Sequence, residues 1–173
     1  MNKLIAFSIL FLLTTSYITS QNKNTKTASQ TTVYYLIRHA EKDRSNPTNQ
    51  DPELTEKGVE RAKKWAEIFK DIPLDQIYST DYNRTLQTAD FTAKYKGLEV
   101  LIYNPKKLYN RRFQTSTKGK TVLIVGHSNT TPAFVNAIVG KSEYQDMEDS
   151  DNGKLFIVTI KESNTYVETR NYN

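Results

Sequence analysis

Short apolar runs alternate with longer amphipathic stretches along most of the chain. Each apolar run has the length and the β-branched or aromatic content of a strand, and the runs cover residues 32–37, 75–79, 98–103, 121–125, 155–160 and 166–170. The amphipathic stretches have apolar residues at helical spacing and cover residues 55–72, 81–95 and 130–139. Strands that alternate with helices predict an α/β fold of three layers, a mostly parallel central sheet with helices on both faces.

Polar residues at the start of each amphipathic stretch predict helix caps. The side chains of Thr55 and Asp81 can accept hydrogen bonds from the first turn of a helix, and Thr130 or Thr131 can do so before Pro132. Residues 40–53, between the first strand and the first helix, have no periodicity and contain two prolines. A long loop inside a small domain is typical of a functional segment.

The N-terminal part differs in composition from the rest of the chain. Residues 1–20 combine Lys3, an apolar run from Leu4 to Leu13 and a small, polar end at Ser20, which predicts a cleaved signal peptide, with a retained anchor as the alternative. Residues 21–31 are polar and predict a disordered spacer. We therefore expect one domain over residues 32–173, exported to the periplasm or secreted, without stable membrane insertion once the leader is removed. The absence of cysteine excludes disulfides.

The charge pattern gives little sign of a nucleic-acid partner. The formal net charge is +5, and the only basic cluster, between Lys106 and Lys118, lacks the long stripe of Lys and Arg typical of nucleic-acid binding. We expect this segment to be a solvated loop or to attract an anionic substrate.

Three polar clusters follow three of the predicted parallel strands. Arg38 and His39 follow the first strand, Arg84 follows the second, and His127 follows the fourth. The chain contains only two histidines, and both occupy such positions. Because ligands bind at the carboxyl ends of strands in open α/β sheets, we expect these side chains to converge on one site.

These residue types suit a phosphoryl group. Guanidinium groups match phosphoryl oxygens bidentately, so Arg38 and Arg84 can clamp the group, and His127 can donate to a third oxygen. The helix N-terminus opened by Ser128 to Pro132 adds backbone donors and the helix dipole, so we also expect Ser128 to take part in phosphate binding. His39 is then left as the nucleophile, because nearby arginines favour the neutral, nucleophilic form of an imidazole.

Three segments carry a resemblance to a known family. LIRHAEK, YSTDYNRTLQTA and VLIVGHSN resemble the three signatures of the histidine phosphatase superfamily, the phosphoglycerate mutase-like fold, in its small single-domain branch similar to phosphohistidine phosphatases. The resemblance implies that His39 becomes a covalent phosphohistidine, that Arg38 and Arg84 bind the phosphoryl group, and that His127 stabilises it during transfer. It also implies hydrolysis by water with neither a metal nor a cofactor. Ala40 stands where the family usually has Gly.

The proton donor for the leaving group departs from the family pattern. Many relatives have a Glu after the third strand or an Asp after the second histidine, whereas this chain has Asn104 and Ser128 at those places. Glu41 is the first candidate, followed by Asp43 and Asp81. Glu41 is equally suited to pair with an arginine.

The sequence therefore predicts a metal-independent phosphatase that acts on phosphomonoesters or on phosphohistidine. Its expected partners are a small phosphorylated substrate or a phosphoprotein, and its oligomeric state is left open. Two alternatives remain at this stage. One is a phosphate-binding pseudo-enzyme that has lost turnover, and the other is a mutase of the phosphoglycerate type, although the short connection between the third and fourth strands favours hydrolysis.

Overall fold

The computed structural model describes residues 30–173, so the predicted signal peptide and nearly all of the predicted spacer lie outside the described residues. The strands are β1 (Thr32–Arg38), β2 (Gln76–Ser79), β3 (Val100–Ile102), β4 (Thr121–Gly126), β5 (Lys154–Lys161) and β6 (Asn164–Asn171). They form one sheet in the order β3-β2-β4-β1-β5-β6. The first four strands pair in parallel, and β5 and β6 join antiparallel beside β1. The predicted α/β fold is confirmed.

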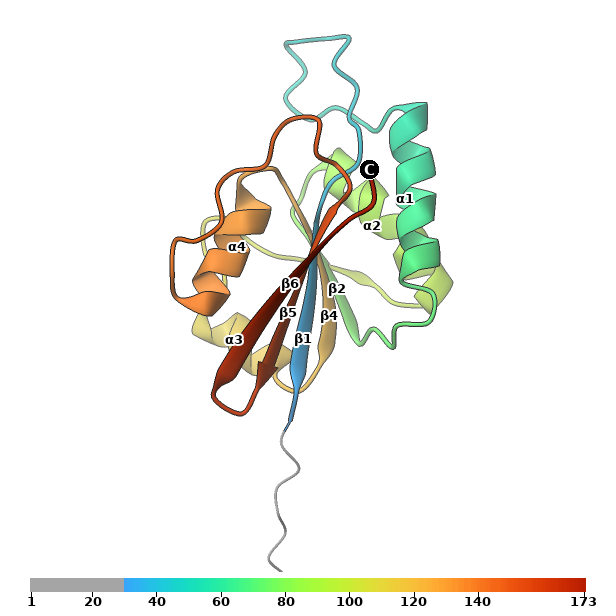
Figure 1. Ribbon diagram of the computed structural model, residues 1–173. Helices are drawn as coiled ribbons and strands as arrows, with labels where there is room; N and C mark the ends of the chain where they lie inside the picture. The colour runs from blue at the N-terminus through green and yellow to red at the C-terminus, as the bar shows by residue number, and fades with distance from the viewer. Residues whose placement is uncertain (1–29) are drawn as a thin grey trace, which may run out of the picture.

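Helices cover both faces of this sheet (Figure 1). They are α1 (Glu56–Ile68), α2 (Asn83–Lys96), α3 (Arg111–Thr117) and α4 (Thr130–Val139). One core packs α1 and α2 on the sheet through residues such as Trp65 and Ala89. The other packs α3 and α4 on the opposite face through Phe113 and Phe134. The core strands are buried on both faces, which explains why their sequences are continuous apolar runs.

The register of the central strands brings their carboxyl ends to one level. Arg38, the last residue of β1, lies opposite Gly126, the last residue of β4. Ser79, which ends β2, lies opposite Val125. The residues that directly follow these strands therefore emerge side by side at one edge of the sheet, as the sequence predicted.

Two of the predicted helix caps are wrong. Thr55 caps α1 as expected, through its hydroxyl and the amide of Gly58. At α2, however, the N-cap residue is Tyr82, and the carboxylate of Asp51 in the long loop accepts from the amide of Asn83 at 2.9 Å. At α4 the N-cap is Asn129. A partner supplied by a distant loop leaves no local pattern, so the sequence favoured the neighbouring Asp81 instead.

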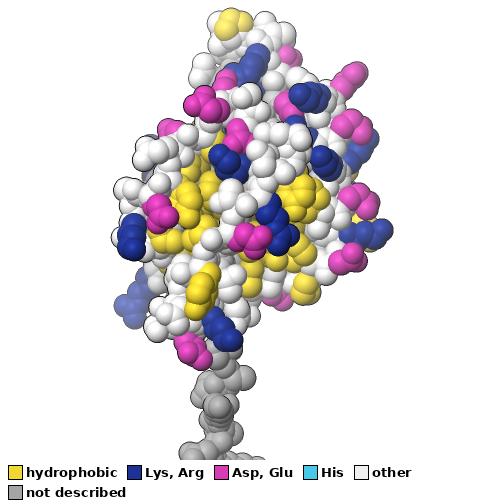
Figure 2. Space-filling model, viewed as in Figure 1, with side chains coloured by type: hydrophobic (Ala, Val, Ile, Leu, Met, Phe, Trp, Pro, Cys, Tyr) yellow, Lys and Arg dark blue, Asp and Glu magenta, His cyan; other side chains and the backbone are white. Residues whose placement is uncertain are grey.

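The surface carries both signs of charge. Figure 2 shows one face of the molecule, on which Lys and Arg side chains are interspersed with Asp and Glu side chains. Among the described residues, no helix has both the length and the apolar character needed to span a bilayer.

Candidate active site

His39 directly follows β1 and is held through its backbone and its ring. Its amide donates to the carbonyl of Gly126 at 2.9 Å, and its own carbonyl accepts from the side chain of Asn152 at 2.9 Å. Its Nδ1 lies 2.7 Å from the carbonyl oxygen of Ala40. Because a carbonyl can only accept, Nδ1 carries the proton, and Nε2 keeps the lone pair. The imidazole is thus oriented as a nucleophile through Nε2.

His127 lies beside His39, although 88 positions separate them along the chain. Their ring centroids are 5.4 Å apart, with the rings inclined at 68°. Nε2 of His127 is 2.8 Å from the hydroxyl oxygen of Thr80, which follows β2. The ring of Tyr82 meets the ring of His127 edge to face at 5.1 Å. Contacts from two neighbouring strand ends therefore fix the orientation of His127.

Arg84, in the first turn of α2, joins the same cluster. Its guanidinium carbon lies 4.5 Å from the centroid of the Tyr82 ring, the ring that also contacts His127. Its Nη1 is 3.4 Å from a carboxylate oxygen of Asp51, and the side chain is 12% exposed. The aromatic contact and the carboxylate hold the guanidinium at the edge of the site.

Arg38 is buried, with 2% of its side chain exposed, and the loop between α4 and β5 covers it. Its Nη1 donates to the backbone carbonyls of Glu148 and Asp149 at 2.8 Å and 3.1 Å. Its Nη2 donates to the carboxylate of Asp149 at 2.8 Å. The other oxygen of that carboxylate pairs with Arg44 at 2.7 Å. One carboxylate therefore bridges the site arginine and a loop arginine.

Both site arginines retain an unsatisfied donor. The Nε of Arg38 and the Nε of Arg84 are buried, and neither has a hydrogen-bond partner within the described part of the chain. Buried N–H groups in folded proteins are nearly always paired, since an unpaired one loses its hydration without compensation. Two such donors on guanidinium groups next to the histidines indicate a site built to receive an anion.

Both histidines are neutral at neutral pH. Burial and, to a smaller extent, the nearby charges of Arg38 and Arg84 lower the pKa of His39 to about 3, against the opposing effect of the hydrogen bond to Ala40. Burial lowers the pKa of His127 to about 4, together with the charges of the same arginines and of Lys42. A neutral imidazole is the form that can attack phosphorus.

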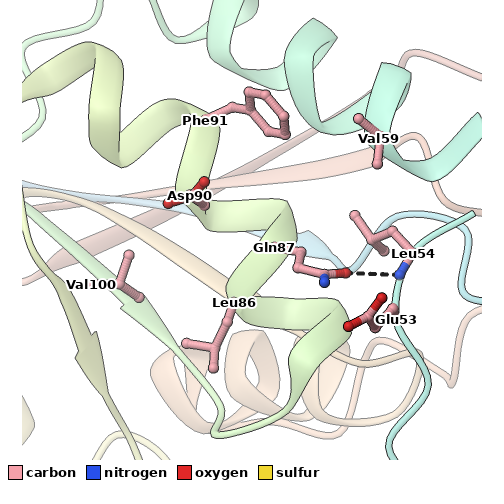
Figure 3. A pocket seen from close by; sticks show the side chains of 8 residues that line it. All are labelled: Glu53, Leu54, Val59, Leu86, Gln87, Asp90, Phe91 and Val100. Atoms are coloured by element: carbon pink, nitrogen blue, oxygen red, sulfur yellow. Dashed lines mark hydrogen bonds between the residues drawn. The ribbon is translucent and has the colours of Figure 1, made fainter. Parts of the chain in front are cut away.

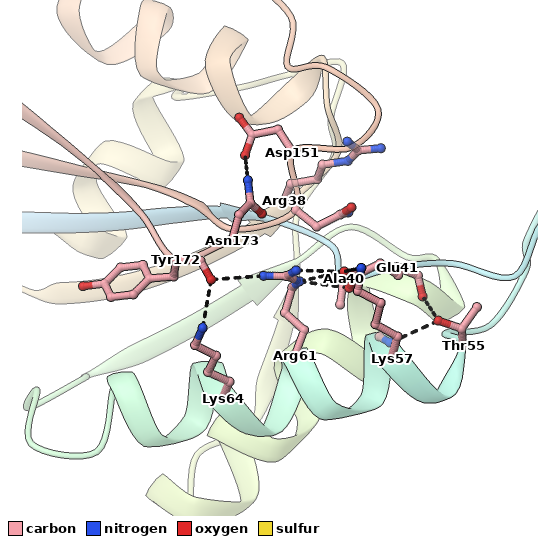
Figure 4. Close-up of polar contacts among 12 residues, drawn as sticks. Arg38, Ala40, Glu41, Thr55, Lys57, Arg61, Lys64, Asp151, Tyr172 and Asn173 are labelled. Carbon is pink, nitrogen blue, oxygen red and sulfur yellow. Dashed lines mark hydrogen bonds and ion pairs between the residues drawn. The ribbon is translucent and has the colours of Figure 1, made fainter.

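Glu41 points toward α1, where Arg61 binds it (Figure 4). Nε and Nη2 of Arg61 lie 2.8–3.0 Å from its carboxylate oxygens, and the ammonium of Lys57 is 3.6 Å away. Burial favours the protonated acid, but the hydrogen bonds and charge of Arg61 prevail, and the pKa of Glu41 is lowered. Of the two roles that the sequence left open, this geometry favours the ion pair, while proton donation stays a prediction.

The other candidate residues, Asp43, Asp81 and Ser128, differ in exposure and in contacts. Asp43 is exposed and accepts from the amide and hydroxyl of Ser45, and Asp81 is also exposed. Ser128 is half-buried beside His127, and its carbonyl accepts from the amide of Met147 at 2.9 Å. Its predicted part in phosphate binding, and those of the two aspartates in proton transfer, stay predictions.

Several residues of the site were missed by the sequence reasoning. Asp149 and Asn152, in the loop before β5, contact Arg38 and His39. Asp51 contacts Arg84, and the hydroxyl of Thr88 accepts from the amide of Ala40 at 2.9 Å. Only the density of acidic residues at 146–151 could have drawn attention to that loop, because each partner is far away along the chain.

A cavity of about 210 Å³ lies next to His39. It is lined by His39, Glu41, Lys42, Arg44, Lys57, Asp149, Ser150 and Asn152. The lining is almost wholly charged or polar, and basic side chains outnumber acidic ones. Within residues 30–173 no group of three or more metal-ligating side chains gathers in a way that could hold an ion. The arrangement can bind an anion and present a neutral imidazole to it.

Comparison with known proteins finds relatives of the first half of the domain. Residues 34–104 match the family described as the histidine phosphatase superfamily (branch 1), a range that includes Arg38, His39 and Arg84 and ends before His127. Phosphoserine phosphatase 1 of Hydrogenobacter thermophilus is 41% identical over 71 residues, which are 38% of this chain and 33% of that enzyme. The match therefore spans about a third of that relative's length.

Solved structures extend the likeness to most of the domain. Phosphoglycerate mutase from Bacillus anthracis superposes with a TM-score of 0.61 at 17% identity, over 82% of this chain and 93% of that one. The protein histidine phosphatase SixA in complex with tungstate superposes with a TM-score of 0.62 at 13% identity, over 80% of this chain and 96% of that one. At such identities the likeness establishes the fold.

Proposed function

We propose that this chain is a member of the histidine phosphatase superfamily that hydrolyses phosphomonoesters or phosphohistidine without a metal, through a covalent phosphohistidine on His39. The observation that carries the proposal is the pair of buried, unpaired Nε donors on Arg38 and Arg84 beside a neutral imidazole whose Nε2 is free to attack. An anion-binding pocket alone would not need the nucleophile. A nucleophile alone would not need two buried guanidinium groups.

In the first step, Nε2 of His39 attacks phosphorus, the bond from phosphorus to the leaving oxygen breaks, and that oxygen takes a proton from solvent or from the predicted donor Glu41. The proton stays on Nδ1, which donates it to the carbonyl of Ala40 in a hydrogen bond, and that carbonyl stabilises the positive charge that develops on the ring. Arg38 and Arg84 stabilise the phosphoryl oxygens, and His127 donates to a third oxygen. In the second step, water attacks phosphorus, the P–N bond breaks, and phosphate leaves with a neutral His39.

Asp149 shows how an anion fits against Arg38. Its carboxylate accepts from Nη2 of Arg38 at 2.8 Å, the contact that a phosphoryl oxygen would make with the same donor. The side chain of Asp149 is 70% exposed, so it can turn toward solvent when a substrate arrives. Burial is slight there, and hydrogen bonds from Arg38 and Arg44 lower the pKa of Asp149, so it remains an anion and competes with substrate.

The chemistry and the size of the site favour small substrates. The cavity of about 210 Å³ next to His39 admits a phosphoryl group with a few further atoms. The partial relative is named a phosphoserine phosphatase, and one structural neighbour is a protein histidine phosphatase, so phosphoserine and a phosphohistidine peptide are the first compounds to assay. Export to the periplasm or medium, which the leader predicts, would expose the enzyme to extracytoplasmic phosphate esters.

Trapping of the phosphoenzyme tests the proposal. Wild type should release phosphate from an aryl phosphate, and His39→Ala should be slower by about a thousandfold or more, because removal of a nucleophile abolishes the covalent route. Brief incubation with labelled substrate should label wild type in a form that is stable to base and lost in acid. The surface variant Lys141→Gln serves as the control for handling and folding.

Three results would contradict the proposal. Equal, slow release of phosphate by wild type and His39→Ala would leave a phosphate-binding pseudo-enzyme. A label stable to acid would place the phosphoryl group on another residue. Isomerisation of phosphoglycerate without release of phosphate would identify a mutase.

A further inference from the structure

The backbone on either side of Lys42 is fixed at the mouth of the site. Lys42 pairs as an antiparallel bridge with Leu54. The amide of Asp43 donates to the carbonyl of Glu53 at 2.8 Å, and the amide of Thr55 donates to the carbonyl of Glu41 at 2.9 Å. Arg61 of α1 binds the carboxylate of Glu41, the residue before Lys42. Lys42 lines the same cavity as His39.

The other cations around this cavity have carboxylate partners. Arg38 and Arg44 share Asp149, and Lys57 lies 3.6 Å from Glu41. The carboxylate of Asp51 lies 3.4 Å from Arg84. Lys42 makes no ion pair within 4 Å among residues 30–173, although it is only partly exposed.

The charge of Lys42 interacts with other groups of the site. Burial lowers its pKa, and the nearby charges of Arg44, Arg84 and Arg38 lower it further, while only Asp149 opposes them. The same ammonium group contributes to the low pKa of His127. A cation kept among like charges without a counterion is costly, which indicates that a ligand supplies the missing negative charge.

We propose that Lys42 is a specificity-determining residue that binds a second anionic group of the substrate, so that the enzyme prefers small phosphomonoesters that also carry a carboxylate or another phosphate. The inference rests on the proposed function. In the proposed function, Arg38, Arg84 and His127 bind the phosphoryl group itself. An ammonium at the rim of the cavity, about three residues along the chain from the nucleophile, is placed for the part of the substrate beyond the ester oxygen.

Matched substrates separate this role from general electrostatic attraction. 2-Phosphoglycolate and ethyl phosphate each have two carbons, and only the first has a carboxylate. Lys42→Met should lower kcat/KM for 2-phosphoglycolate by about ten- to a hundredfold, the effect of one hydrogen bond to a charged group, and change ethyl phosphate less than about threefold. Lys42→Arg should keep most of the preference. Lys141→Gln removes one exposed positive charge elsewhere and should change neither substrate.

A second pair of substrates detects proton donation by the ammonium instead. If Lys42 were the general acid, Lys42→Met would slow phenyl phosphate far more than p-nitrophenyl phosphate, whose leaving group needs no proton. That pattern would overturn the proposal. Equal losses with 2-phosphoglycolate and ethyl phosphate would overturn it as well, because they would place the ammonium on the phosphoryl group.

Binding measured in a variant without turnover tests the inference independently of catalysis. Calorimetric titration of His39→Ala should show tighter binding of 2-phosphoglycolate than of ethyl phosphate, and His39→Ala combined with Lys42→Met should lose the difference. A difference that persists in the double variant overturns the role of Lys42. If wild type bound both compounds but hydrolysed none of the four esters, the proposed function would be contradicted. The binding comparison would still show whether Lys42 recognises the carboxylate. Thermal unfolding confirms that the variants are folded.

Discussion

Two cavities of this protein differ in size and in chemistry. The larger, about 550 Å³, lies where α1 and α2 meet and is lined by Glu53, Leu54, Val59, Leu86, Gln87, Asp90, Phe91 and Val100 (Figure 3). The smaller, about 210 Å³, lies beside His39 at the carboxyl end of β1. Between these two, volume alone would favour the one at α1 and α2 as the site.

Two polar side chains of the larger cavity, those of Gln87 and Asp90, already have partners. The amide of Leu54 donates to the side-chain oxygen of Gln87 at 2.8 Å, and the carboxylate of Asp90 pairs with Lys94 at 2.7 Å. Beside the smaller cavity, by contrast, Arg38 retains a buried donor without a partner, and Lys42 lacks a carboxylate. Unsatisfied polar groups that converge on one point identify the reactive site better than volume does.

Removal of a site guanidinium should have the largest effect. Arg84→Met removes a donor to the phosphoryl oxygens, and we expect kcat/KM for an aryl phosphate to fall about 10²- to 10³-fold, as for loss of one transition-state donor. Lys94→Met, on the outer face of the same helix, is the matched control. A loss as large in the control would mean that α2 as a whole, rather than the guanidinium, matters.

Acidification should have the next largest effect, because it favours the unfolded chain, in which His39 can be protonated. Because the pKa of His39 is about 3 when folded and about 6.5 when unfolded, the unfolded chain binds more protons between these values. The stability that comes from a neutral His39 is therefore complete above pH 6.5 and is lost as the pH falls toward 3. Between pH 7 and 5, wild type should lose about 2 kcal/mol more than His39→Asn in denaturant titrations. Parallel curves would show that His39 titrates normally.

A smaller loss should follow from a substitution at Gly58, where α1 touches the loop that carries Lys42. A Cβ at this position would collide with the backbone carbonyl of Glu41. Although Ala favours a helix over Gly by about 1 kcal/mol, displacement of backbone costs more. We expect Gly58→Ala to destabilise the fold by about 1–2 kcal/mol and to reduce activity, as measured by urea unfolding and by phosphate release. A stabilised, fully active variant would refute this contact.

The larger cavity should show the smallest effect on activity. Phe91→Ala removes a half-buried ring from its wall, and we expect a loss of about 1 kcal/mol in the free energy of unfolding, with kcat/KM changed less than about twofold. A clear loss of activity in a protein of unchanged stability would show that the larger cavity contributes to activity. It would contradict the distinction drawn between the two cavities.

The strands and the core helices could be predicted because their signals are local. Continuous apolar runs such as Val122–Val125 report burial on both faces, and the apolar spacing around Trp65 reports a helix that packs on one face. Helix caps were less predictable, because at α2 the carboxylate comes from Asp51, more than thirty residues earlier.

The candidate site was predictable only where residues follow parallel strands. His39 and His127 each come directly after a strand, so the topology alone brings their rings together. Asp149 and Asn152 belong to a loop between α4 and β5 whose path has no periodic pattern. The role of Glu41 likewise depended on the approach of Arg61 from α1, a contact over twenty positions.

The sequence by itself determined which side chains could react, because short-range patterns place both histidines and both arginines at the ends of strands that share one edge. Only the tertiary structure decided how those side chains are charged and paired. Desolvation and the competition among nearby carboxylates and guanidinium groups depend on distances through space, which do not follow from separation along the chain.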